Sequence, residues 1–226
     1  MMNSPLYAYE TNVSLKKEYK ILQGIFSLSL CLFIIFAAVK LTLMFKQLYY
    51  FDIQYLNIEA QSGYSKTEII KNYNYVINYL LTPGNQEFIL PSIEYSKYGQ
   101  IHFKDVKRIF TSIDILLIVT GLINVLGLIF NIKHKSFDFL KHTSAMLILV
   151  PAVLFTAIMI NFDAAFVTFH EIFFKNDYWL FDPTIDPIIT ILPDEFFYHT
   201  ALLIIALIVI SIIALGLTYR RLKIKR

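Results

Sequence analysis

Four stretches of the chain are apolar and carry no charged residue. They cover 19, 18, 20 and 20 residues, at 21–39, 115–132, 143–162 and 200–219. A helix of about 20 residues crosses the hydrocarbon core of a membrane, which is about 30 Å thick. Lipid offers no partner to backbone polar groups, so helices suit such runs. The pattern predicts an all-α membrane bundle of four transmembrane helices, at 21–45, 109–132, 143–162 and 200–219.

The first apolar run has an alternative interpretation as a signal peptide. The run is long for a signal peptide, and Lys40 follows it rather than a small-residue cleavage site. The tetrapeptide LSLC at 28–31 faintly resembles a lipobox, but Leu30 stands where a small residue is needed. We therefore expect a membrane helix with Cys31 buried in it.

The segment 46–108, between the first two predicted helices, has patterns of its own. Its residues 49–59, YYFDIQYLNIE, alternate polar and apolar with one slip of phase, which predicts a strand with a bulge. The sequence SKTE at 65–68 is a capping box, which predicts a helix that ends at the TPGN of 82–85. FILPSIEY, at 88–95, predicts a second short strand. We expect a small α+β extracytoplasmic cap rich in interfacial tyrosines.

Lysine and arginine are distributed unevenly between the segments outside the membrane. Segments 1–20, 133–142 and 220–226 hold 11 in 37 residues, whereas 46–108 and 163–199 hold 8 in 100. The positive-inside rule predicts both termini and the 133–142 loop in the cytoplasm, with 46–108 and 163–199 outside. The composition agrees with a membrane protein, because 57% of residues are apolar and 16% are charged.

Several chemistries have no support in the sequence. The single cysteine excludes a disulfide framework, and a net charge of +3 is too small to indicate a nucleic-acid partner. There is no glycine-rich phosphate loop, and the zincin motif that His170 and Glu171 would begin fails at Phe174. We expect no cofactor, no metal, no nucleotide and no nucleic acid.

Polar residues gather at the expected outer ends of the helices, where function in a membrane protein is best sought. His102 has Asp105 three residues later, and His170 has Asp163 seven residues earlier, which places each pair on one face of a helix. A pKa near 6.5 favours such histidines for acid–base work. Spacing alone leaves a structural role open, because a lone histidine at the boundary is more often structural. His199 is expected to anchor the fourth helix at the interface.

His134 and His142 fall in the predicted cytoplasmic loop, where solvated side chains are expected. Lys40 and Asp114 are buried charges that also suit a transport path, but the chain shows no repeated halves.

Two segments resemble a known family. They are YGQIHFKDVKRIF, at 98–110, and FHEIFFKNDYWLFDPTIDPIITILPDEFF, at 169–197. Both are similar to signature segments of the bacterial lipoprotein intramolecular transacylases, and the similarity covers nearly the whole chain. The family's two essential outer-surface histidines fall on His102 and His170. Further positions also fit the pattern: Asp105, Asn176, Asp177, Trp179, Asp182 and Asp186.

The resemblance implies a reaction in the bacterial cell membrane. The substrate is a lipoprotein whose N-terminal cysteine carries a diacylglyceryl thioether and a free α-amine. The enzyme moves the sn-2 acyl chain to that amine, which gives the N-acyl, S-monoacylglyceryl lyso form. Substrate and membrane lipids are the expected partners, and the site faces outside.

The roles expected from this reaction follow. His170 is the general base for the amine and later gives its proton to the departing glyceryl oxygen, with Asp163 or Asp177 orienting it. His102, held by Asp105, stabilises the ester oxyanion or shares the proton transfer.

Four more side chains are candidate donors to the ester or the peptide carbonyl: Asn176, Trp179, Lys40 and Arg108. Trp179 has the alternative of an interfacial belt anchor, and Arg108 that of a headgroup contact. Asp182 and Asp186 precede prolines and are expected to form turns.

Two other functions remain open at this stage. One is a non-enzymatic membrane protein whose outer cap binds a partner. The other is a zinc-dependent outer-face hydrolase that uses the outer histidines.

Overall fold

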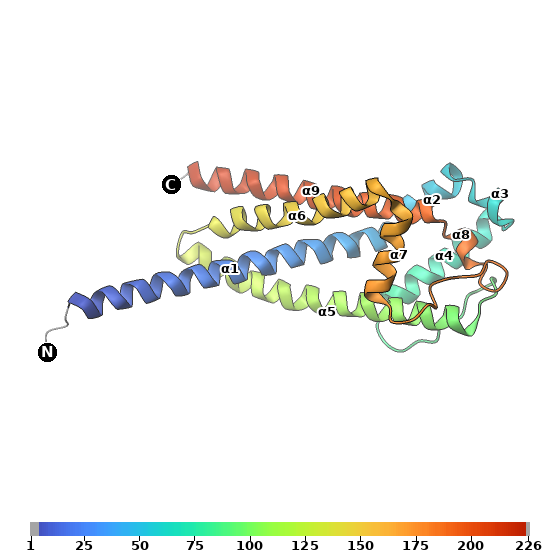
Figure 1. The fold of residues 1–226 in the computed structure, drawn as a ribbon, viewed down its shortest axis with the longest axis horizontal. Coiled ribbons are helices and arrows are strands. Elements are labelled where there is room, and N and C mark those ends of the chain that lie inside the picture. The colour runs from blue at the N-terminus through green and yellow to red at the C-terminus, as the bar shows by residue number, and fades with distance from the viewer. Residues whose placement is uncertain (1–4, 225–226) are drawn as a thin grey trace. The chain divides into compact units, whose positions relative to one another are not determined.

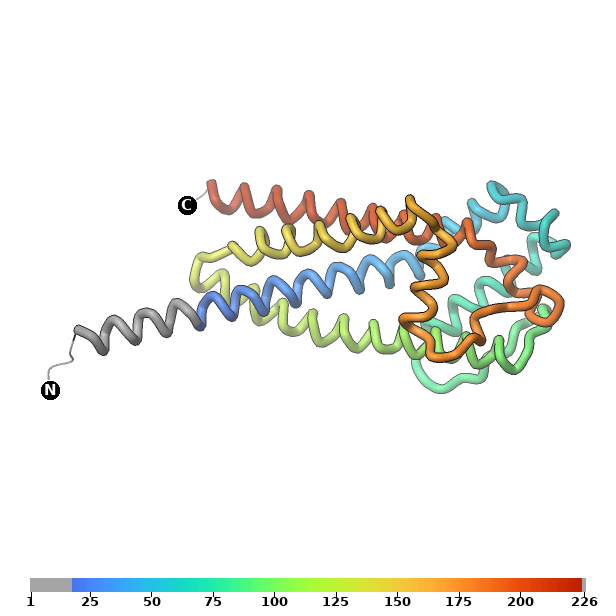
Figure 2. The backbone as a smooth tube through the Cα atoms, in the orientation of Figure 1, coloured from blue at the N-terminus to red at the C-terminus, as the bar shows by residue number. Residues whose placement is uncertain are grey.

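The protein is described by a computed structural model over residues 5–224, with side chains from residue 18 onward. Within that range the chain is helical, with no strand (Figures 1 and 2). The helices are α1 (Pro5–Met44), α2 (Lys46–Tyr55), α3 (Ile58–Ser62), α4 (Lys66–Leu81), α5 (Lys97–Lys133), α6 (Asp138–Ile160), α7 (Phe162–Phe173), α8 (Ile188–Ile191) and α9 (Asp194–Ile224). The expected inner tails 1–20 and 220–226 lie partly outside the described residues.

Within the described part of the chain, four helices are long and apolar enough to cross a membrane, in agreement with the predicted number of spans. They are Glu18–Met44, Lys97–Lys133, Asp138–Ile160 and Asp194–Ile224. Large apolar side chains along them are exposed, as Leu126 (65%) and Leu149 (67%) illustrate. Such a surface requires lipid around it.

The chain divides into two compact units. One contains the chain up to Ile35, Leu117–Pro151 and the chain from Ile208 onward; the other contains Phe36–Leu116 and Ala152–Leu207.

The first unit joins membrane helices through paired polar groups and close packing. Gln23 Nε2 donates to Asn131 Oδ1 over 2.6 Å, in a buried contact between α1 and α5. Gly127 lets the Phe26 ring approach, because a Cβ there would lie 2.6 Å from a ring carbon. Small residues and paired amides are the usual means by which helices associate in lipid. Cys31 is buried in this packing, as expected.

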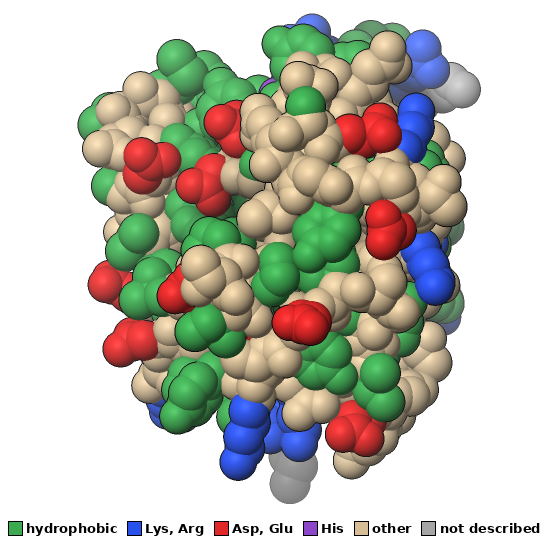
Figure 3. Space-filling view, turned by 90° about the vertical axis from the view of Figure 1, so that its right-hand side faces the viewer, with side chains coloured by type: hydrophobic (Ala, Val, Ile, Leu, Met, Phe, Trp, Pro, Cys, Tyr) green, Lys and Arg blue, Asp and Glu red, His purple; other side chains and the backbone are tan. Residues whose placement is uncertain are grey.

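The second unit has an aromatic core contributed by short helices. The Tyr49 ring of α2 stacks on the Tyr73 ring of α4 with centroids 3.7 Å apart, and the Tyr49 hydroxyl donates to the Ile191 carbonyl over 2.6 Å. The predicted capping box begins α4, where the Ser65 side chain accepts from the Glu68 backbone N–H. Over the end of this unit that faces right in Figure 1, acidic side chains are scattered and cations lie at the margins (Figure 3).

The predicted strand at 49–59 is wrong. This segment forms α2 and the start of α3, separated by Asn57 with a positive φ of 55°. The buried side chains of α2 are Tyr49, Asp52 and Ile53, at helical spacings of three and four residues. Tyr49 and Ile53, four residues apart, fit both periods, whereas Asp52 fits only the helical one. The slip of phase near Tyr55 marks the end of α2 rather than a bulge.

The second predicted strand, at 88–95, is also wrong, so the cap between the first two spans is helical rather than α+β. Backbone groups of this segment bond to side chains instead of a partner strand. The Ile89 N–H donates to the Tyr75 hydroxyl over 2.7 Å, and the Phe88 carbonyl accepts from Gln100 Nε2 over 3.0 Å.

Candidate active site

His170 lies near the end of α7, a short helix of the second unit (Figure 1). Asn161 caps its start, because its side-chain oxygen accepts from the Ala164 N–H over 2.9 Å. One turn before the histidine, the Phe166 carbonyl lies 2.8 Å from His170 Nδ1. A carbonyl only accepts, so Nδ1 carries the proton, and in the neutral ring Nε2 keeps its lone pair.

The surroundings of His170 favour that neutral ring. Burial lowers the pKa of the His170 imidazole, against the smaller opposing effects of the Phe166 carbonyl and the Asp194 charge. The Trp179 indole stacks on the ring with centroids 4.7 Å apart. Trp179 therefore contacts the candidate base directly. The alternative role of an interfacial anchor stays a prediction.

His102 lies on the first turns of α5, in a pocket of aromatic rings. Its side chain is 7% exposed, and its Nδ1 has no hydrogen-bond partner among the described residues. The ring packs against Phe174 and Phe181, with centroids 4.9 and 5.3 Å away. A buried nitrogen without a partner is costly to the fold and is a natural contact for a substrate atom.

The structure brings His102 and His170 together. Their ring centroids are 6.2 Å apart, and the Phe174 ring contacts both of them. Two imidazoles at this separation can act on one substrate group. Sequence reasoning missed Phe174 and Phe181, whose only signal was their place in the aromatic motif of 169–197.

Asp105, which was expected to hold His102, has other hydrogen-bond partners. Asp105 does not bond to His102; one of its oxygens accepts from Arg108 over 2.8 Å and the other from Asn176 over 3.2 Å. Asn176 in turn accepts from the Tyr178 N–H over 3.2 Å. Asp105 thus ties the loop after α7 to α5.

A second tie between the same segments involves Asp186, which is 5% exposed. Its carboxylate accepts from both the N–H and the hydroxyl of Ser96, over 2.7 and 2.8 Å, just before α5 begins. Gly99 leaves room for this carboxylate, because a Cβ there would clash with it. Asp182 forms the expected turn by accepting from the Thr184 N–H and hydroxyl.

Three other predicted site residues do not bond to the histidines. Asp163 lies in the first turn of α7 and Asp177 is exposed, whereas the acceptor at His170 Nδ1 is a backbone carbonyl. Lys40 pairs with Asp114 over 2.6 Å, between α1 and α5.

An acid–histidine pair that spacing did not predict joins α2 to α9. Asp52 is fully buried, and its Oδ1 lies 2.8 Å from His199 Nδ1. Burial raises the pKa of the Asp52 carboxyl, against the lowering effect of His199. His199, expected to be an interfacial anchor, is thus the partly exposed partner of a buried carboxylate.

Among the side chains of residues 18–224, no group of three or more His, Cys, Asp or Glu lies together as a metal site.

Comparison with known proteins identifies the family of this chain. Residues 24–197 match the family described as lipoprotein intramolecular transacylase Lit. A solved structure of that membrane integral enzyme from Bacillus cereus has a TM-score of 0.89 and 39% identity, covering 91% of this chain and 96% of the other. No curated protein sequence matches the chain.

Two further Bacillus cereus structures carry a single histidine substitution, by arginine in one and by alanine in the other. Both have a TM-score of 0.86, with identities of 37% and 38%, and they cover 96% and 95% of this chain and 97% and 98% of theirs. The chain therefore belongs to the lipoprotein intramolecular transacylase family.

Proposed function

We propose that this chain moves the sn-2 acyl group of an S-diacylglyceryl-cysteine to the α-amine of the same cysteine. The product is an N-acyl, S-monoacylglyceryl lipoprotein. The observation that carries the proposal is the meeting of His102 and His170, 6.2 Å apart, in a chain of the transacylase family. That family favours acyl transfer over both a partner-binding cap and a zinc hydrolase.

His170 Nε2 is the proposed base for the amine. The Phe166 carbonyl keeps the proton on Nδ1, and burial keeps the ring neutral near pH 7. An α-amine has a pKa of about 7.7–8.0, so part of it is neutral at that pH and attacks the ester carbon. As the C–N bond forms, Nε2 takes the amine proton.

His102 is proposed to stabilise the oxygen of the tetrahedral intermediate. Its Nδ1 is buried without a partner in the described chain, so an N–H there would be free to donate to that oxygen. When the C–O bond to glycerol breaks, His170 returns its proton to the leaving oxygen. Atoms balance with no water and no external acyl donor.

The surrounding protein is proposed to hold the ester against the amine. Asp105 and Asp186 fix the loop after α7 on α5, and this loop carries Trp179, which packs on His170. Holding two reacting groups of one molecule in contact supplies up to about 7–11 kcal/mol of catalysis. Asn176 and Arg108 are already engaged by Asp105, so we propose that they position the site rather than bind the ester.

We further propose that the site faces outside the cell, because the Lys/Arg distribution predicts both termini inside. Lys71 and Lys141 are exposed positions in the two predicted compartments. In a Cys31→Ser background, Lys71→Cys should react with an impermeant thiol reagent in intact cells. Lys141→Cys should react only after permeabilisation, and the opposite labelling would overturn the orientation.

The reaction itself is tested with purified protein, a synthetic diacylglyceryl lipopeptide and detergent alone. An intramolecular transfer changes no mass, so the product must appear at the starting mass with one acyl chain on the amine in its tandem mass spectrum. A heavier triacyl product, or a product that forms only after phospholipid is added, would contradict the proposal.

A further inference from the structure

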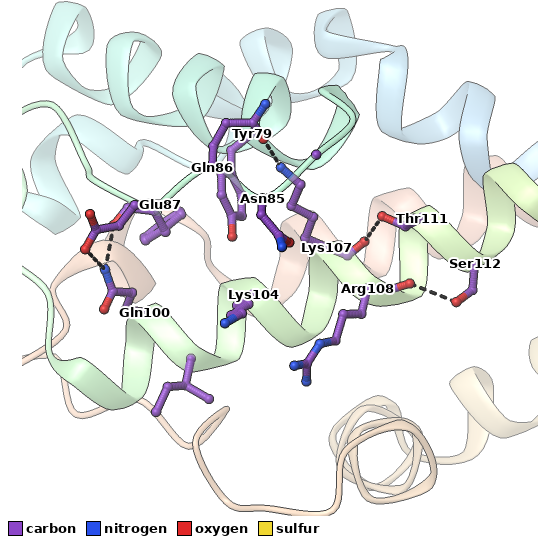
Figure 4. A pocket seen from close by; sticks show the side chains of 13 residues that line it. Tyr79, Asn85, Gln86, Glu87, Gln100, Lys104, Lys107, Arg108, Thr111 and Ser112 are labelled. Atoms are coloured by element: carbon purple, nitrogen blue, oxygen red, sulfur yellow. Dashed lines mark hydrogen bonds between the residues drawn. The ribbon is translucent and has the colours of Figure 1, made fainter.

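A cavity of about 780 Å³ opens between α4, the 82–96 segment and α5 (Figure 4). It is distinct from the space around the histidines, because neither His102 nor His170 lines it. Cations line its α5 side: Lys104, Lys107 and Arg108. Amides line much of the opposite side, among them Asn85 and Gln86.

The three cations lie on one stripe of α5, at spacings of three and four residues. Like charges so placed repel one another. Lys107 is 7% exposed; its ammonium donates to Gln86 Oε1 and lies 4.3 Å from the centre of the Tyr79 ring. Among the described residues neither Lys104 nor Lys107 has a carboxylate in ion-pair contact. A buried ammonium that meets only an amide and a ring leaves its charge uncompensated.

Two carboxylates near the cavity, Glu87 and Asp105, do not neutralise its positive charge. Glu87 lines the wall and is exposed, with Oε1 accepting from Gln100 over 3.4 Å. Asp105 pairs with Arg108, whose side chain is 70% exposed. The cavity therefore keeps an excess of positive charge.

The position of the cavity along α5, close to the predicted membrane surface, indicates that its anionic ligand comes from the membrane. Lys107 and Arg108 precede the charge-free run that begins at Ile115 by eight and seven residues respectively, roughly 10–12 Å of helix. Thr111 and Ser112, which also line the cavity, are roughly 5–6 Å from it. The polar layer of a bilayer is about 5–8 Å thick on each side of its hydrocarbon core. Long basic side chains reach that layer.

We propose that this cavity binds the phosphate group of an anionic membrane phospholipid. The lysine ammoniums bind the phosphate oxygens, and the acyl chains lie along the exposed apolar face of α5. The lipid is bound and not consumed, so the site differs from that of the acyl transfer. Since Arg108 joins both the cavity wall and Asp105, the lipid contacts the same turn of α5 that holds the loop after α7.

The test measures lipid binding by the purified full-length protein, with native mass spectrometry in detergent. We expect phosphatidylglycerol to bind more tightly than zwitterionic phosphatidylcholine. Lys104→Gln should raise the apparent Kd for phosphatidylglycerol roughly fivefold to tenfold, as expected for losing one hydrogen-bonding contact from an exposed side chain. Lys104 is exposed, so this variant should fold, and Lys104→Arg should restore binding.

Lys97→Gln is the matched control, because Lys97 is an exposed lysine of the same helix that does not line the cavity. It should leave the Kd unchanged. Equal losses in both glutamine variants, or no loss in either, would overturn the site. Millimolar inorganic phosphate should not displace the lipid; Lys104-dependent phosphate binding with no preference for phosphatidylglycerol would overturn the lipid as the source. The readout is binding, so it is independent of the proposed reaction.

Discussion

Two arrangements of histidine in the second unit contrast sharply. His199 pairs with the fully buried Asp52 over 2.8 Å, in the geometry usually associated with a catalytic dyad. Among the described residues His102 and His170 have no carboxylate as a hydrogen-bond partner, yet their rings lie 6.2 Å apart among aromatic side chains. We propose that the second arrangement carries the chemistry of the family to which the chain belongs.

The two arrangements differ in the group that the histidine Nδ1 contacts: a carboxylate for His199 and a backbone carbonyl for His170. A buried acid at Nδ1 fixes the imidazole in place through a direct side-chain contact, which suits a link between α2 and α9. A backbone carbonyl at Nδ1 fixes the tautomer and orientation without adding a charge. The second environment favours a neutral ring, which suits the role of base that we propose for His170 near pH 7.

The largest effect should come from the pair without carboxylates. His170→Ala and His102→Ala should each lower the rate of lyso-lipoprotein formation about 10²–10⁴-fold, because each removes a positioned acid–base or donor group. The rate is measured with a lipopeptide in detergent, beside the amount of protein in the membrane. His134→Ala and His142→Ala, at exposed positions, serve as controls and should keep near-full rates. Full activity in the double His102/His170 variant would refute the mechanism.

The other arrangement should show its effect in stability. His199→Ala leaves the Asp52 carboxylate buried without its partner, a change that costs about 3–5 kcal/mol in a fully buried pair. Because the His199 side chain is 23% exposed, we expect the lower end of that range. The thermal midpoint in detergent should fall, while the rate per folded molecule stays within about threefold. A rate loss as large as that of His170→Ala would erase the distinction between the two arrangements.

The pH profile sharpens the same contrast. The rate should fall about tenfold per pH unit below about 7.7, as the amine protonates. Burial lowers the pKa of His170, so the base form is kept as the pH falls to 6.5 and is lost only at lower pH, where the profile should steepen. If the rate instead falls more steeply than tenfold per unit between pH 6.5 and 7.7, the pKa of the histidine is raised rather than lowered. A carboxylate partner would raise it in this way.

The smallest effect concerns the acids that spacing placed beside His170. Asp163→Asn and Asp177→Asn should each change kcat less than twofold, because the acceptor at Nδ1 is the Phe166 carbonyl. Initial rates at saturating lipopeptide measure this. A tenfold loss of kcat in either variant would show that the substituted acid orients His170.

Local pattern predicted the parts of the fold that local physics determines. Charge-free runs of about 20 residues gave the four spans, and the capping box at Ser65 gave the start of α4. Alternation failed at 49–59, where an aromatic-rich segment satisfies two periods and packing against Tyr73 selects the helix.

The candidate site was predicted only in part, for a related reason. The two histidines were chosen by residue type, position and resemblance. Their partners were not, because Asp52 and His199 are 147 residues apart in the chain and Asp105 and Asn176 are 71 apart. Helical spacing describes neighbours on one helix and carries no information about which side chains meet between helices.

The most direct test of the account is a crossover experiment with the purified wild-type protein. Two lipopeptides of different peptide mass are mixed in detergent, one of them with isotopically heavy acyl chains. Transfer within each molecule, at the His102 and His170 pair, predicts that every heavy amide stays on the peptide that began heavy, with no mixed product in the tandem mass spectra. Heavy acyl groups on the light peptide's amine would contradict the account.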